Sequence, residues 1–154
     1  MRLLFLVLLF AIFSSCLKNE ICVPLDIRVK ANIYTIETVN QDQFLLTHKL
    51  DIDTLYAIGI AEKFIVLNES ELSEFYLPLD NAHDQSSFVL NVGGLKDTIR
   101  IEYNKELLLN SIKCGVYYRY SITNLSYTTH LLKEIRILNP EIDVVSTENI
   151  QVVY

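Results

Sequence analysis

Apolar and polar side chains alternate with a period of two along most of this chain, and this pattern constrains the fold more than any other feature. Residues 25–33 show it most clearly, with apolar side chains at Leu25, Ile27, Val29, Ala31 and Ile33. Successive side chains of a strand point to opposite faces of its sheet, so the pattern predicts a strand with one buried face. Similar alternation recurs in residues 116–123, 134–137 and 150–154, and weaker candidate strands lie at 54–61, 64–67 and 75–79.

A tight β-hairpin is predicted around Gly93 and Gly94, because glycine adopts the positive φ of a two-residue turn at no steric cost. This turn would pair Val92 with Leu95 and Phe88 with Ile99. The register places one set of apolar side chains on a single face: Phe88, Leu90, Val92, Leu95, Ile99 and Ile101. The other face is polar, with Asn91, Lys96, Thr98, Arg100 and Glu102, and only Val89 and Asp97 break the separation.

About eight short strands joined by polar turns predict an all-β fold, an antiparallel β-sandwich of immunoglobulin-like or barrel-like form. Residues 104–112 fit two turns of helix, with Asn104 as the cap, or a strand, so we expect at most one short helix. We find no repeat or long linker, and we expect residues 22–154 to form a single domain.

The amino-terminal end predicts export. Arg2 precedes the uninterrupted apolar run 3–13, which is typical of a cleaved signal peptide over residues 1–15 and too short for a spanning helix. The junction FSSC resembles the lipobox of bacterial lipoproteins, in which the cysteine carries a diacylglyceryl group. We therefore expect Cys16 to be lipidated, with 16–21 as a tether; the alternative is an ordinary signal that leaves Cys16 as a free or paired thiol.

Two further cysteines, Cys22 and Cys114, are expected to form a disulfide, since paired cysteines of exported proteins are commonly bridged. The bond would close a loop of about 90 residues and contribute on the order of 4 kcal/mol in the chain-entropy model. The alternative is a pair of buried, reduced thiols.

The net charge of the chain restricts the kinds of partner that it can bind. Loss of residues 1–15 removes one positive charge, so 12 basic and 19 acidic side chains remain, a formal net charge of −7. Net negative charge disfavours nucleic acid, which repels it. The same repulsion disfavours an anionic membrane surface. We expect no nucleic acid partner, and attachment to the membrane through the lipid anchor.

No catalytic, cofactor or metal site is predicted. The three histidines, His48, His83 and His130, lack the spacing of metal ligands, and there is no GxSxG nucleophile motif. The polar loop of Asp80, Asn81, His83 and Asp84 offers oxygen ligands for calcium but lacks the EF-hand pattern, and such loops are common between strands. Asp51 and Asp53 form a candidate carboxylate pair, although solvated edge charges that oppose aggregation are the simpler explanation.

Tyrosine is the one enriched residue of interest, with nine copies and no tryptophan in the chain. Tyr117, Tyr118 and Tyr120 lie on one predicted strand, and Tyr127 follows. Exposed tyrosines would form a binding surface for a glycan or a protein. The alternative is that these are ordinary strand residues, half of them in the core.

Several short motifs together resemble an uncharacterised family of Bacteroidota lipoproteins of unknown function: the lipobox cysteine, ICVPLDIRV, FYLPL, DTIRIEY, KCG and NIQVVY. The resemblance covers most of residues 22–154. It implies a small all-β domain in which Cys22 and Cys114 are bridged, with Gly115 beside the second cysteine, and it implies no activity.

The expected function is a lipoprotein of the cell envelope with a non-enzymatic binding or structural role and a protein or glycan partner. The stretch after Cys16 has one acid, Glu20, and lacks the acidic run of surface-exported lipoproteins, so we expect a periplasm-facing outer-membrane anchor. The alternative is a carboxylate- or metal-dependent hydrolase of an envelope or dietary polymer, with Asp51, Asp53, Asp80 and Asp84 in its site.

Overall fold

The structure is a computed structural model that describes residues 22, 25, 27–59, 64–144 and 147–154. This part of the chain contains eleven strands and no helix. They are β1 (Arg28–Val39), β2 (Asp42–Thr47), β3 (Leu50–Ile58), β4 (Phe64–Leu72), β5 (Glu74–Pro78), β6 (Gln85–Val92), β7 (Leu95–Ser111), β8 (Gly115–Tyr127), β9 (Glu134–Ile137), β10 (Glu141–Ile142) and β11 (Ile150–Val153). The described residues include no helix of the length and hydropathy required to cross a bilayer.

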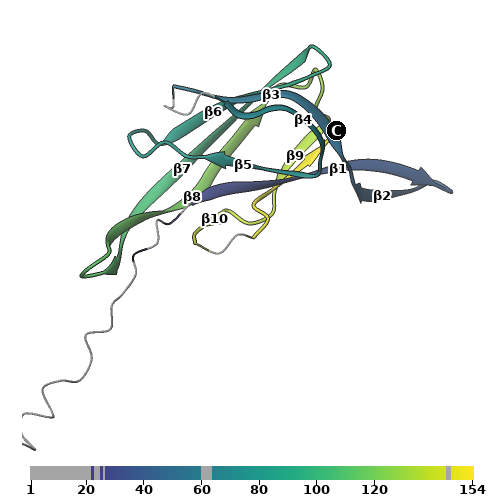
Figure 1. The fold of residues 1–154 in the computed structure, drawn as a ribbon. Coiled ribbons are helices and arrows are strands. Elements are labelled where there is room, and N and C mark those ends of the chain that lie inside the picture. Colours follow the sequence, from purple (N-terminus) through teal and green to yellow (C-terminus); the bar gives the residue numbers. More distant parts are fainter. Residues whose placement is uncertain (1–21, 23–24, 26, 60–63, 145–146) are drawn as a thin grey trace, which may run out of the picture.

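The strands form two sheets that pack together as a β-sandwich, as the alternation predicts (Figure 1). One sheet has the order β2-β1-β11-β9, and β5 also pairs with β1. The other has the order β10-β8-β7-β6-β3-β4. All neighbouring pairs are antiparallel except β1 and β11, which run parallel with Ala31 opposite Ile150.

The core lies between the sheets and is built from the inward positions of the alternating strands. Val29, Ala31 and Ile33 of β1 are completely buried, which confirms the buried face predicted for this segment. The strand itself starts at Arg28 and continues to Val39, beyond the predicted residues 25–33. Its extra length carries the hairpin that β1 forms with β2.

The β6–β7 hairpin has the predicted register, with Val92 opposite Leu95 and Phe88 opposite Ile99. Gly93 and Gly94 both have positive φ, 58° and 82°, as the two-residue turn requires. Leu95 is predicted on the apolar face but is half exposed; it directly follows the two-residue turn, whereas its partner Val92 is buried.

Residues 104–112, which fit either a helix or a strand, are extended: 104–111 belong to β7 and Ile112 begins the turn into β8. The count of about eight strands was too low because β2 and β10 lack the alternation. In β2 the apolar residues Phe44, Leu45 and Leu46 are consecutive and exposed, and β10 has only two residues.

Candidate functional site

The turn between β7 and β8 lies next to Cys22, the first described residue of the chain. The sulfur atoms of Cys22 and Cys114 are 2.00 Å apart and their Cα atoms 5.3 Å apart, the disulfide distance expected from the sequence. The turn is held by Ser111, whose Oγ accepts a hydrogen bond of 3.0 Å from the backbone N–H of Cys114. Gly115, with φ of 76°, completes the turn in a conformation that favours glycine.

Four apolar side chains are exposed around this turn, and we call them the hairpin tip: Leu107, Leu109, Ile112 and Val116. Leu109 is 66% exposed and Ile112 is 99% exposed. The register pairs Leu107 with Tyr118 and Leu109 with Val116, on the same face as the buried pair Tyr103 and Ile122. The tip is therefore a continuation of the core-facing surface past the point where the other sheet ends.

The four tyrosines singled out from the sequence do not form one exposed patch. Tyr120 is buried and packs edge-on against Tyr103 at a centroid distance of 5.3 Å. Burial raises the pKa of Tyr120 to about 12, so its hydroxyl stays protonated. Tyr118 and Tyr127 are partly buried against the core. Three of the four thus serve packing, the alternative given for them above.

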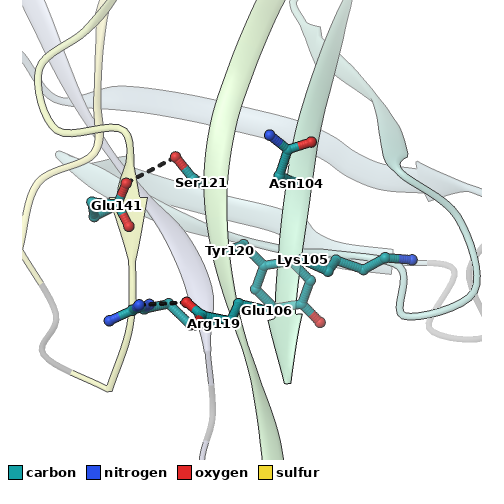
Figure 2. A pocket seen from close by; sticks show the side chains of 7 residues that line it. All are labelled: Asn104, Lys105, Glu106, Arg119, Tyr120, Ser121 and Glu141. Atoms are coloured by element: carbon teal, nitrogen blue, oxygen red, sulfur yellow. Dashed lines mark hydrogen bonds and ion pairs between the residues drawn. The ribbon is translucent and has the colours of Figure 1, made fainter. Parts of the chain in front are cut away.

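A shallow polar pocket of about 260 Å³ lies along β7 and β8 next to β10 (Figure 2). Cross-strand partners Glu106 and Arg119 form an ion pair on its wall, and Ser121 donates a hydrogen bond of 2.8 Å to Glu141 of β10. The Glu106 carboxylate raises the pKa of the Arg119 guanidinium, which therefore remains charged and paired. The pocket residues thus hold the β7, β8 and β10 strands together.

The Asp80 loop, considered above for calcium, contains its own cation. The Lys105 ammonium donates hydrogen bonds to the carbonyl oxygens of Asn81 and His83, each at 3.1 Å, and contacts the Asp84 carboxylate at 2.9 Å. Asp84, one of the oxygen ligands considered for calcium, is thus paired with this ammonium. The Asp80 carboxylate accepts from the backbone N–H of Ala82 and lies 2.7 Å from His83 Nδ1, and these contacts, led by His83, lower its pKa.

Asp51 and Asp53 lie on the outer face of β3, and each accepts a backbone hydrogen bond, Asp51 from strand β4 and Asp53 from the β6–β7 turn. Asp51 Oδ1 accepts from Glu71 N at 2.9 Å, and Asp53 Oδ2 accepts from Gly94 N at 3.4 Å. The described residues contain no group of three or more His, Cys, Asp or Glu side chains that could hold a metal ion. The four carboxylates of the hydrolase hypothesis therefore each have a separate structural contact.

Asp97 interrupts the alternation of β7 with a polar side chain on its apolar face. Its side chain is 0% exposed, at an inward position of β7. It accepts hydrogen bonds from the Thr128 hydroxyl and from the backbone N–H groups of His130, Leu131 and Leu132, at 2.5 to 2.9 Å. Burial alone would raise the pKa of Asp97, but these hydrogen bonds outweigh it and hold the pKa far below 3.8.

This carboxylate fixes the segment that follows β8 to the start of β7. Thr98 strengthens the same contact, since its N–H donates to Thr128 Oγ1 and its carbonyl accepts from Thr128 N. Asp97 thus clamps the root of the β7–β8 hairpin. In the sequence, the break in alternation at Asp97 was the only sign of this contact, because the partners of Asp97 lie more than 30 residues away.

The signal peptide over residues 1–15, the tether over 16–21 and the lipid-bearing Cys16 all lie outside the described residues. They stay predictions from the sequence. The described part begins at Cys22, which is the point where the chain is joined to the β7–β8 turn.

The fold and the paired cysteines define the class: a small β-sandwich with a cysteine pair that joins its amino-terminal segment to a projecting hairpin. Residues 54–154, more than half of the chain, match the family of unknown function DUF6452, and the chain belongs to this family. The match includes Cys114 and the β7–β8 hairpin and begins after Cys22, β1 and β2. No curated protein and no solved structure matches the chain.

Proposed function

We propose that this protein is a lipoprotein of the cell envelope, anchored through acylated Cys16, whose β-sandwich has a non-enzymatic binding or structural role. The observation that carries the proposal is the pairing of Cys22 with Cys114. Disulfides persist in oxidising compartments, which agrees with the export signal expected from residues 1–15. The pairing also accounts for two of the three cysteines and leaves Cys16 as the one available for lipid.

A binding or structural role is preferred to hydrolysis because of how the candidate carboxylates are used. Asp51 accepts a hydrogen bond from β4, Asp53 accepts one from the β6–β7 turn, Asp80 organises its own loop, and Asp84 pairs with Lys105. A pair of catalytic carboxylates would need to converge on a substrate with separated pKa values. The structural contacts of these four groups instead stabilise the loops of the sandwich, as expected of a domain that presents a binding surface to a partner.

The anchor places the protein at a membrane, and the outer membrane with the domain facing the periplasm is the location that we propose. Two or more acyl chains on one residue give a stable attachment, since each buried CH₂ contributes about 0.8 kcal/mol. The partner is then a protein or a glycan of the envelope, because the acidic body repels nucleic acid.

Replacement of Cys16 tests the anchor. We expect Cys16→Ala to lose metabolic labelling by fatty acid and to leave the membrane fraction for the soluble periplasmic fraction. The lipoprotein peptidase acts before a lipidated cysteine and would not cut the leader of this variant. The variant is therefore expressed with an ordinary cleavable leader, so that a retained leader cannot imitate an anchor.

The matched control is Cys22→Ser combined with Cys114→Ser, which removes the other two cysteines and keeps Cys16. This control should stay acylated and membrane-bound. A Cys16→Ala protein that fractionates with the membrane as the wild type does would contradict the proposal.

A further inference from the structure

The hairpin tip is apolar where a β-sandwich surface is normally polar. Leu107, Leu109, Ile112 and Val116 are each more than half exposed. They cluster at one end of the molecule, where the β7–β8 hairpin extends beyond the rest of the sandwich (Figure 1). Contiguous exposed apolar side chains of this kind mark surfaces that contact a partner or a membrane.

The covalent path from Cys16 ends at this tip. Five residues lie between Cys16 and Cys22, so the two cysteines are six steps apart along the chain. An extended chain spans at most about 3.5 Å per step, roughly 21 Å in total. Cys22 in turn lies 5.3 Å from Cys114, Cα to Cα, within the turn that carries Ile112. Whatever path the tether takes, an acyl group on Cys16 cannot be far from the hairpin tip.

The charge of the tip suits a phospholipid surface. Residues 107–118 contain no acidic side chain, in a chain that has 19 Asp and Glu residues, and they contain one basic side chain, Lys113. The first acid on the β7 side, Glu106, is paired with Arg119. Tyr117, the one tyrosine of this group not assigned to packing, follows the apolar positions, and tyrosine is enriched where membrane proteins meet the headgroup layer.

We propose that the hairpin tip inserts into the interfacial layer of the same bilayer that holds the lipid anchor. This inference rests on the proposed function, since it needs the acyl chains of Cys16 to bring the tip to the membrane. In such contacts the apolar side chains are usually buried about 5–10 Å into the boundary between headgroups and acyl chains. Insertion fixes the orientation of the sandwich, because the body is then held at two adjacent points, the acyl group and the hairpin.

The chain contains no tryptophan, so a single introduced tryptophan reports its own surroundings. The test uses the full acylated protein with Ile112→Trp, bound to phosphatidylcholine–phosphatidylethanolamine vesicles that contain a phosphatidylcholine with brominated acyl chains. Ile112 is 99% exposed, so the substitution leaves the core intact. The matched control is Phe44→Trp in β2, an exposed apolar position on the hairpin that projects in the opposite direction (Figure 1).

We expect the emission of Ile112→Trp to shift to the blue on vesicle binding and to be quenched by brominated lipid several-fold more than that of Phe44→Trp. Vesicle flotation separates the possible failures. Protein that floats with the vesicles but shows equal, weak quenching at both positions would overturn the inference and leave the anchor standing. Protein that does not float would overturn both. A blue shift of Ile112→Trp that depends on protein concentration and occurs without vesicles would show that a second copy covers the tip, which also overturns the inference.

Discussion

Two hairpins project from this sandwich toward opposite ends of the molecule, and they are held in different ways (Figure 1). The β7–β8 hairpin is fixed at both of its ends: Asp97 clamps its root, and Cys114 in its turn is joined to Cys22. Among the residues that the structure describes, the β1–β2 hairpin is held at its root, where the His48 ring stacks on Tyr154 at 5.4 Å. All six residues of β2 are exposed.

Exposed apolar side chains therefore do not have the same meaning in the two hairpins. Phe44 and Leu46 of β2 are about as exposed as Leu107 of β7. Only the β7–β8 hairpin, however, combines its apolar tip with a buried anion at the root and a covalent link to the segment that follows Cys16. We infer that the β7–β8 hairpin must keep a defined position, as a membrane contact would require, whereas the structure shows no such requirement for β1–β2.

Removal of the cross-link should give the largest change in stability. The link closes 92 residues of sequence separation, for which the chain-entropy model gives up to about 4 kcal/mol at 25 °C. We expect somewhat less for Cys22→Ser with Cys114→Ser, because removal of the link also increases the conformational freedom of the folded protein. Urea unfolding of the purified protein measures the change.

The matched comparison is Phe44→Ser on the other hairpin. Because this side chain is half exposed, its replacement should change the free energy of unfolding by no more than about 0.5 kcal/mol. If the serine variant destabilised the protein as much as loss of the cross-link, the claimed contrast between the hairpins would be wrong.

The clamp at the root gives the next largest effect. Asp97→Asn keeps the shape of the side chain but places an NH₂ group against the backbone N–H donors of Leu131 and Leu132. The substitution leaves these buried N–H donors without their charged acceptor, which should lower the free energy of unfolding by about 3 kcal/mol. Asp51→Asn is the control, since this exposed carboxylate accepts one backbone hydrogen bond and its loss should cost about 0.5 kcal/mol.

The same clamp predicts a loss of stability in acid. The pKa of Asp97 is lower in the folded protein than its ordinary value of 3.8, so its contribution is complete above about pH 4 and is lost as the pH falls further. Thermal unfolding between pH 5 and the lowest usable pH should therefore be less pH-dependent in Asp97→Asn than in the wild type. Identical acid dependence in both proteins would show that Asp97 is not the clamp.

The β6–β7 hairpin shows how far the sequence could predict the fold. Gly93 and Gly94 fix the turn, and the alternation on either side then leaves one register, because a shift by one residue would move Phe88 and Ile99 to the wrong face. The signal is local and strong. The parallel pairing of β1 with β11 lacked any such signal, because it joins segments more than 110 residues apart.

The candidate site was less predictable for related reasons. Leu107, Leu108 and Leu109 are consecutive, so their sequence did not distinguish a strand from a helix or an exposed face from a buried one. Their exposure depends on where the opposite sheet ends, which is a property of the whole fold. The pairing of Cys22 with Cys114 could be expected from counting cysteines, but its place at the apolar tip could not.

The most direct test of the account is a peptide map, under non-reducing conditions, of the protein extracted from its native membrane. Cleavage before aspartate yields the segments 16–25 and 97–142, which contain Cys16 with Cys22 and Cys114 respectively. We predict one linked species in which 16–25 begins at an acylated Cys16 and is joined through Cys22 to 97–142, so that the lipid and the hairpin are covalently connected. An amino terminus that still includes residues 1–15 without fatty acid, or free thiols at Cys22 and Cys114, would contradict the account.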